Sequence, residues 1–321
     1  MHRDVEESPD ALRPLLFSIA YRMLGRVGDA EDVVQESYAR MQRAVAGGER
    51  IESARAYLCT VATRLAIDEL RSARVRRETY VGAWMPEPLL TDEAPVAPDP
   101  SAQAEKADTL TMAFLLVLER LTPVERAVFL LHDVFGYGYD EVAAVVGKGE
   151  ANCRQLAARA RRHLREDRPR SDTSREEQRE LAARFLGAAV DGDVDRLVGM
   201  LAEDAVAYGD GGGNAPQWSS PIRGGLRVAR MLAGLGRTMT SVGATLEPRE
   251  VNGQPGALVR GPDGRLVNVL VLDVSAGAVQ TVRSVINPDK LRHLGPVADA
   301  WALLRSRGRN PADPADPGGN R

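Results

Sequence analysis

The stretch from Glu150 to Arg170 combines side chains that can read DNA with a spacing that gathers them on one side of a helix. It holds seven arginines against three acidic residues. At helical spacing one face collects the residues that should pack inward, namely Cys153, Leu156, Ala157, Ala160 and Leu164. The opposite face collects those that should point outward, namely Arg154, Gln155, Ala158, Arg159 and Arg162.

Arginine and glutamine can form paired hydrogen bonds with guanine and adenine edges in the major groove, and a small alanine lets the helix approach closely. The elements before this helix fit that use. Thr122, Pro123 and Glu125 form a capping box, and a short helix from Asp140 to Val146 precedes a turn at 147–149. This order predicts a helix-turn-helix. The alternative is an ordinary bundle helix with a solvated arginine face.

A second basic run, Arg64 to Arg77, carries five arginines against two acids, and an acidic run covers Gly28 to Glu36. The net charge of −3 therefore hides local faces of opposite sign. A basic face within a neutral chain can still bind a polyanion. Either run taken alone is also typical of a solvated helix face.

Composition excludes several classes of protein. Hydrophobic residues make up 44% and charged residues 27%, as in a soluble globular protein, and no apolar run reaches the length of a membrane span. The acidic start lacks the features of a secretion signal, which predicts a cytoplasmic protein. Cys59, Cys153 and the four histidines are scattered, so we expect no disulfide, no metal site and no cofactor.

At 321 residues the chain should hold several domains. Helical periodicity covers the first segment, five prolines between Met85 and Ser101 mark a linker, helices then return, and the last part ends in strands such as "RLVNVLVLDV". We predict domains at 9–80, 104–168 and 175–295, a linker at 81–103 and a disordered tail at 306–321. The fold class is two all-α domains followed by an α+β domain.

The blocks "DAEDVVQESYARM" with "ARAYLCTVATRLAIDELRSARVRR", and then "LTPVERAVFLLHDVFGYGYDEVAAVVGKGEANCRQLAARARRHL", resemble regions 2 and 4 of extracytoplasmic-function (ECF) sigma factors, which are promoter-specificity subunits of bacterial RNA polymerase. The resemblance implies binding of core polymerase and promoter DNA by a chain that is not an enzyme. A stand-alone helix-turn-helix regulator is the alternative, although it would need neither the acidic run nor the segment that melts DNA.

The resemblance also assigns residues. The acidic helix, implied to contact the polymerase clamp helices, supplies Asp29, Glu31, Asp32, Gln35 and Glu36. The segment implied to read and melt the −10 element supplies Tyr57, Arg64, Arg71, Arg74, Arg76 and Arg77, although Tyr57 could equally be a core residue. The −35 element is implied to be read by Arg154, Gln155, Ala158 and Arg159, with Arg161 and Arg162 better suited to phosphates.

Three further motifs resemble those of a subgroup with a fused SnoaL-like (NTF2-like) domain. They supply an implied regulatory set: Trp84, Pro86, Glu87 and Pro88 of "WMPEP", Asp210, Gly211, Gly212 and Gly213 of "DGGG", and Asn287, Pro288, Asp289, Lys290 and Leu291 of "NPDKL". Because glycines allow close backbone approach, we hypothesise that the DGGG loop docks on WMPEP. A catalytic loop or a mobile surface loop is the alternative.

Some SnoaL-like proteins are cyclases or isomerases, so a small-molecule enzyme is the alternative for this domain. The candidate acids are Asp204, Asp210 and Asp273, and His293 lies beyond the last strand, so the sequence shows no acid/base pair. A regulatory domain with an unidentified small-molecule ligand is favoured.

Two departures from the family are Gly149, which should be a weak helix cap, and Asn214, where a basic residue is expected.

Overall fold

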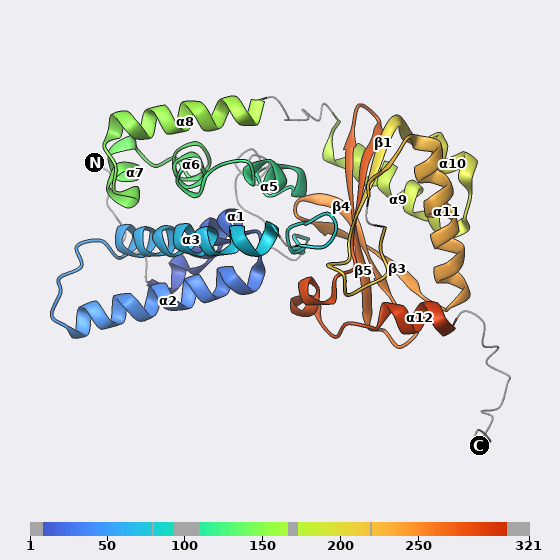
Figure 1. Cartoon of the computed structure of the whole chain (residues 1–321), viewed down its shortest axis with the longest axis horizontal. Coiled ribbons are helices and arrows are strands. Elements are labelled where there is room, and N and C mark those ends of the chain that lie inside the picture. Colours follow the sequence, from blue (N-terminus) through green and yellow to red (C-terminus); the bar gives the residue numbers. More distant parts are fainter. Residues whose placement is uncertain (1–8, 79, 93–108, 166–172, 219, 307–321) are drawn as a thin grey trace, which may run out of the picture. The chain divides into compact units, whose positions relative to one another are not determined.

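The computed structural model describes residues 9–78, 80–92, 109–165, 173–218 and 220–306; for 73–78, 165 and 306 it describes the helix path alone. The chain divides into two compact units. The helical unit comprises Met1–Tyr80, Trp84–Arg170 and Val251–Gln254, and the α+β unit comprises Val81–Ala83, Ser171–Glu250 and Pro255–Arg321. Figure 1 labels most of the helices and strands of both.

The helical unit begins with a short 3-10 turn, η1 (Pro9–Leu12), and the helices α1 (Arg13–Leu24), α2 (Val27–Ala46) and α3 (Ala54–Glu78). The corner between α1 and α2 is made by Gly25, whose φ of 68° lies in the left-handed region that favours glycine. Apolar residues at helical spacing on the three helices pack together, as the sequence predicts.

The second part of the helical unit contains α5 (Met112–Leu118), α6 (Pro123–Phe129), the π-helical turn η2 (Leu130–Val134), α7 (Tyr139–Val146) and α8 (Glu150–Arg165). The predicted capping box is present, because the Thr122 side chain accepts from the Glu125 amide and Glu125 accepts from the Thr122 amide. Gly147, with φ 66°, ends α7 and opens the turn to α8. The helix-turn-helix lies where the sequence predicts it.

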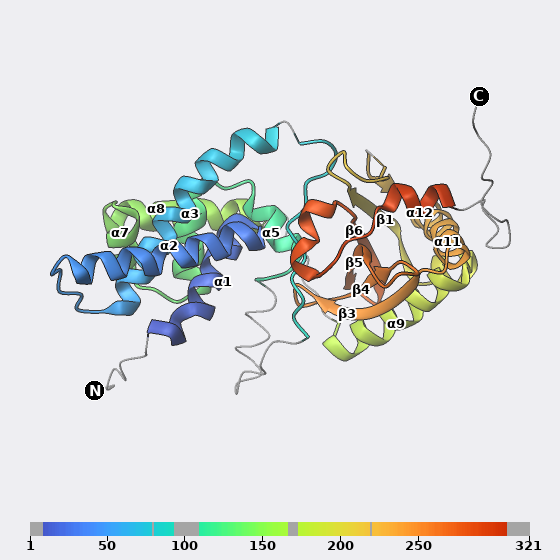
Figure 2. The same cartoon turned by 90° about the horizontal axis from the view of Figure 1, so that it is seen from below.

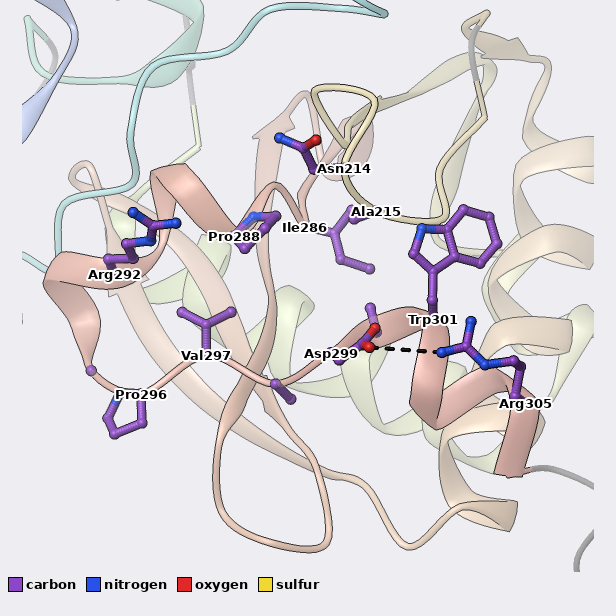
Figure 3. A pocket seen from close by; sticks show the side chains of 13 residues that line it. Asn214, Ala215, Ile286, Pro288, Arg292, Pro296, Val297, Asp299, Trp301 and Arg305 are labelled. Carbon is purple, nitrogen blue, oxygen red and sulfur yellow. Dashed lines mark ion pairs between the residues drawn. The ribbon is translucent and has the colours of Figure 1, made fainter.

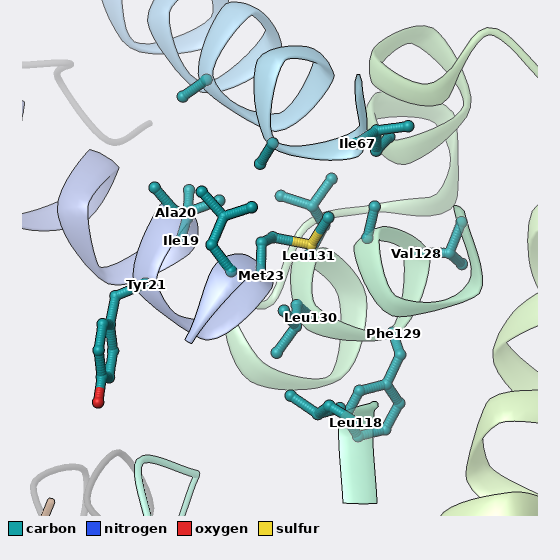
Figure 4. Close-up of a cluster of buried hydrophobic side chains, with 14 of the residues drawn as sticks. Ile19, Ala20, Tyr21, Met23, Ile67, Leu118, Val128, Phe129, Leu130 and Leu131 are labelled. Atoms are coloured by element: carbon teal, nitrogen blue, oxygen red, sulfur yellow. The ribbon is translucent and has the colours of Figure 1, made fainter. Parts of the chain in front are cut away.

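One hydrophobic core joins α1–α3 to α5–α8. Ile19 and Met23 of α1 lie beside Leu130 and Leu131 of η2, with Ile67 of α3 close by (Figure 4). Arg64 of α3 adds polar contacts, since its Nε donates to the carbonyl of Val145 at 2.8 Å and its Nη2 to that of Ala144 at 2.9 Å. The two predicted all-α domains therefore pack as a single body.

The α+β unit starts with the helices α9 (Arg175–Asp191) and α10 (Val194–Val198), and α11 (Gly225–Ser241) follows the second strand. Its strands are β1 (Leu201–Asp210), β2 (Ile222–Arg223), β3 (Thr245–Val251), β4 (Gln254–Arg260), β5 (Leu266–Ser275) and β6 (Ala278–Val285). The 3-10 turns η3 (Pro288–Lys290) and η4 (Arg292–Leu294) lead to α12 (Ala300–Ser306).

These strands form one sheet in the order β2-β1-β6-β5-β4-β3. β1 and β6 run parallel, with Ala207 opposite Val282, whereas β6 is antiparallel to β5 and β5 to β4. Helices α9 and α11 lie against the same face of the sheet (Figure 2), where Phe185 and Val228 are buried with strand residues such as Leu272. The three C-terminal strands seen in the sequence correspond to β4, β5 and β6. The predicted disordered tail begins at Ser306, but that residue ends α12, so the predicted start is wrong by one residue. The rest of the tail, 307–321, and the part of the predicted linker at 93–103 lie outside the described residues.

Candidate polymerase, nucleic-acid and regulatory sites

The predicted reading face of α8 is exposed. Arg154, Gln155, Ala158, Arg159 and Arg162 are accessible, whereas Cys153, Ala157 and Ala160 are 0% exposed and Leu164 is 6% exposed. Leu156 is half-buried and also packs against the core, so the prediction of which residues point inward is confirmed. At the start of α8, the carbonyl of Gly149 accepts from the amides of Asn152 and Cys153. The free surface of a helix-turn-helix second helix thus presents three arginines and a glutamine.

Carboxylates orient most of these arginines. Arg154 pairs with Glu150 at 2.7 Å and stacks over the Tyr139 ring at 5.3 Å, and Arg159 reaches Glu125 at 3.4 Å. Arg161 pairs with Asp133 at 2.6 Å, which raises the pKa of its guanidinium above the ordinary value. Arg162 is exposed and makes no ion pair with any described residue. Held side chains lose less entropy on binding, so Arg154 and Arg159 suit base reading and Arg162 suits a phosphate.

The predicted polymerase-contact residues of α2 differ in exposure and in ion pairing. Asp32 and Gln35 are exposed, and Asp32 pairs with no described cation. The other three are half-buried and paired within the helical unit: Asp29 with Arg26 at 3.7 Å, Glu31 with Arg13, and Glu36 with both Arg40 and Arg43 at 2.8 Å. Hydrogen bonds from Arg40 and then Arg43 hold the pKa of Glu36 below its usual range. Asp32 is therefore the most available charge on this surface.

The predicted −10 residues lie along α3. Tyr57 is half-buried, and Arg71 is exposed and paired with Asp68 at 3.0 Å. Arg64 is exposed but donates to the carbonyls at the end of α7, as described above. The side chains of Arg74, Arg76 and Arg77 lie outside the described part of the structure. Arg64 is thus engaged by the helix-turn-helix segment in this conformation.

The WMPEP motif is packed on the corner between α1 and α2. Glu87 is 4% exposed, and its Oε2 accepts from the Val27 amide at 2.8 Å while its Oε1 accepts from Arg26 Nε at 3.1 Å. Sequence reasoning missed this contact. The signal that could have found it is the absence of Ser, Thr, Asp or Asn before α2, since Arg26 occupies the N-cap position.

The DGGG and NPDKL motifs meet within the α+β unit. Asp210 Oδ2 pairs with Lys290 Nζ at 2.6 Å, and both side chains are almost fully buried. The Asp210 carbonyl accepts from the amides of Ile286 and Asn287, and Asn214 Nδ2 donates to Asp289 Oδ2 at 3.2 Å. Asn214 stands where the resemblance predicts a basic residue, and its side-chain amide donates a hydrogen bond to the Asp289 carboxylate. Docking of the DGGG loop on Trp84–Pro88 stays a prediction.

A cavity of about 820 Å³ opens beside these two motifs (Figure 3). Asn214 and Ala215 line one side, and Trp301 and the Asp299–Arg305 pair of the α12 segment line another. The complete lining is Asn214, Ala215, Ile286, Pro288, Arg292, Gly295, Pro296, Val297, Ala298, Asp299, Ala300, Trp301 and Arg305. Its walls combine apolar, aromatic and cationic side chains.

None of the candidate catalytic acids lines this cavity. Asp210 is paired with Lys290, Asp273 is paired with the buried Arg283, and Asp204 is exposed on β1. His293 follows η3 and is also outside the lining. Among the described residues, no group of three or more His, Cys, Asp or Glu side chains is arranged to hold a metal ion.

Comparison with known proteins identifies the family. The model of Sigma-70 region 2 matches residues 10–76, and that of Sigma-70, region 4 matches residues 111–164. The ECF RNA polymerase sigma factor SigJ of Mycobacterium tuberculosis is 37% identical over 309 residues, which cover 94% of this chain and 97% of that protein. The chain belongs to the ECF sigma factors. The resemblance seen in the sequence is confirmed, and so is a role in transcription initiation.

The solved structure of a relative agrees with the predicted fold class. The crystal structure of M. tuberculosis SigJ is similar to this sigma factor with a TM-score of 0.69 and 36% identity, over 90% of this chain and 98% of that one. An NTF2-like protein of unknown function from Mesorhizobium loti is similar over 37% of this chain and 97% of its own, at 16% identity and a TM-score of 0.29. Among its described helices, this sigma factor has none that is long and apolar enough to cross a membrane.

Proposed function

We propose that this sigma factor binds core RNA polymerase through α2 and reads promoter DNA through α3 and α8, acting in the cytoplasm. The observation that carries the proposal is the presence, in one helical unit, of an exposed acidic helix and a helix-turn-helix whose outward face is rich in arginine. Basic and acidic surfaces on one subunit suit two partners of opposite charge.

Run-off transcription with purified core polymerase tests this function. We expect transcripts from a cognate promoter only when the chain is added to core polymerase. A promoter that lacks its −10 and −35 elements should give no transcript, with or without the chain. A stand-alone regulator would instead bind the promoter tightly without polymerase. Core polymerase would then still produce no transcript when the chain is added. That result would remove the sigma activity from this chain.

The reading helix gives the first prediction. Arg154→Ala or Arg159→Ala should cost about 1–3 kcal/mol at one −35 base pair and relax the preference there, because a bidentate contact to a base edge is lost. Arg162→Ala is the matched control, since an exposed phosphate contact should weaken all sequences alike. Binding of the chain, assembled with core polymerase, to a panel of promoters with −35 variants measures both effects. Equal losses on every variant for all three substitutions would contradict base reading by α8.

We propose that the α+β unit regulates the sigma activity and is not an enzyme. The support is that Asp210 and Asp273 are held in ion pairs with Lys290 and Arg283, which leaves neither carboxylate free to move a proton. The cavity beside Trp301 is the proposed site of a small-molecule ligand, because it is of the size of such sites and its walls offer an indole for stacking and the charged groups of Arg292 and Arg305.

Trp301 reports on that cavity and gives a second prediction. The side chain is 47% exposed, so a ligand that covers it should change the tryptophan emission. We expect a saturable change with a small aromatic carboxylate such as benzoate, which can stack on the indole and pair with Arg305, and a loss of that change in Trp301→Phe. A response that persists in Trp301→Phe would place the ligand elsewhere.

A further inference from the structure

Helix α2, which carries the acidic surface, begins without a cap from its own sequence. Arg26 occupies the N-cap position in an extended conformation, with φ −132° and ψ 131°, and makes no side-chain cap hydrogen bond. The first backbone N–H groups of any helix lack acceptors within the helix and need others. The arginine side chain has no acceptor atom and so cannot cap the helix.

Glu87 of the linker supplies that acceptor. Its Oε2 accepts from the Val27 amide at 2.8 Å, and its Oε1 pairs with Arg26 Nε at 3.1 Å. The side chain is 5% exposed. A carboxylate at this position also stabilises the positive end of the helix dipole. Burial alone would lower the pKa of Arg26, but the carboxylates of Asp29 and Glu87 outweigh it and raise that pKa.

The backbone on both sides of this carboxylate is fixed to the corner between α1 and α2. The Glu87 amide donates to the carbonyl of Gly25 at 2.8 Å, and the Tyr21 hydroxyl donates to the carbonyl of Glu87 at 2.6 Å. Trp84 lies against Gly25 so closely that a Cβ there would be 3.0 Å from the indole. The Glu87 carboxylate is therefore held in place by a segment whose backbone is fixed to α1 and to the corner after it.

We propose that the Glu87 side chain caps the N-terminus of α2 in place of the N-cap residue Arg26, and is thereby a positioning residue for the polymerase-contact surface. This role rests on the proposed function of α2. Val27 begins the helix, and Asp29 and Asp32 lie in its first two turns. Fraying of the first turn would displace Asp29 directly and would leave the next turn, which carries Asp32, at the end of the helix, where it is less firmly held. The linker motif thus sets the geometry of a surface more than fifty residues before it in the sequence.

The capping role is tested by hydrogen exchange in the full chain. In Glu87→Ala we expect the amides of 27–30 to exchange about tenfold faster, which corresponds to about 1.4 kcal/mol, within the usual range for loss of a cap. Glu87→Gln keeps an acceptor oxygen and should restore most of the protection, and it remains usable if Glu87→Ala folds poorly. Unchanged exchange at 27–30 in Glu87→Ala would overturn the capping role.

Affinity for core polymerase tests the positioning role. We expect Glu87→Ala to bind core about five- to tenfold more weakly and Glu87→Gln within about threefold of the unmodified chain, in proportion to the cap that each retains. The matched control is Glu141→Ala, because Glu141 Oε2 accepts from the Gly138 amide at 2.8 Å in the same way at the start of α7. Its core affinity should not change.

Asp32→Arg separates this inference from the function on which it rests. Reversal of that exposed charge should remove core binding without altering exchange at 27–30. If Asp32→Arg weakens core binding while Glu87→Ala does not, the positioning role is wrong and the polymerase surface stands. If Asp32→Arg binds core normally, the polymerase surface is wrong and the positioning role fails with it. An equal loss of core affinity in Glu141→Ala would also overturn the specific role of Glu87.

Discussion

Dyes attached at positions 50 and 148 should lie close together in the free sigma factor and move far apart when it joins core polymerase on a promoter. Arg50 follows α2 and Lys148 lies in the turn of the helix-turn-helix, and both are exposed. In the free chain, the two segments share one hydrophobic core. Promoter elements centred near −10 and −35 are about 25 base pairs apart, or about 85 Å at 3.4 Å per base pair. One compact body cannot cover both.

Energy transfer between Arg50→Cys and Lys148→Cys measures the separation, since the natural Cys59 and Cys153 are buried and should resist labelling. We expect high transfer in the free chain and almost none in the promoter complex. The control pair is Arg50→Cys with Ser72→Cys, because Arg50 directly precedes α3 and Ser72 lies within it, so their separation should not change. Unchanged transfer for positions 50 and 148 in an active complex would show that regions 2 and 4 work with their shared core intact.

The contacts of Arg64 explain why opening should require polymerase. Arg64 donates two hydrogen bonds to α7 in the closed body, so it cannot meet DNA there without giving them up. The buried apolar contacts between α1, α3 and η2 add to the cost of separation. Binding to core polymerase, which we propose occurs through α2, can offset this cost, so the free chain should bind promoter DNA weakly.

Features set by neighbouring residues could be predicted from the sequence. The inward and outward faces of α8 follow from helical spacing, and the Thr122–Glu125 cap involves residues three apart. Contacts between distant segments could not. Glu87 meets Arg26 across 61 positions, and Lys290 meets Asp210 across 80. No local periodicity encodes such pairs, because they depend on how separate elements pack.

The sheet shows the same limit. Strands β4, β5 and β6 are neighbours in sequence and in space, and their apolar runs and turns predict them. β1 pairs in parallel with β6 across a long separation, and it carries acidic residues such as Glu203 that weaken its apolar pattern. Only the α+β context makes it a central strand, so the DGGG motif at its end could not be placed next to NPDKL from the sequence.

That placement makes the Asp210–Lys290 pair the largest single determinant of stability that we expect in the α+β unit. Lys290→Met should lower the free energy of unfolding of this unit by about 3–5 kcal/mol, because it leaves a buried carboxylate without its lysine. The Asp210 side chain is 0% exposed and that of Lys290 is 5% exposed. Denaturant unfolding of the full chain measures the loss. Hydrogen exchange of the β1 and β6 amides shows whether the loss arises in the α+β unit.

Two further variants distinguish pairing from packing. Asp210→Leu with Lys290→Met replaces both charges with apolar side chains, and it should recover most of the loss, as is common for buried pairs replaced together. Arg196→Met breaks the Arg196–Asp191 pair, whose side chains are 52% and 61% exposed, and should cost about 1 kcal/mol or less. Lys290→Met could instead lower the free energy of unfolding no more than Arg196→Met does. In that case the buried pair would not hold the two motifs together. The hydrogen bonds from Ile286 and Asn287 to the Asp210 carbonyl would then be the contacts that do so.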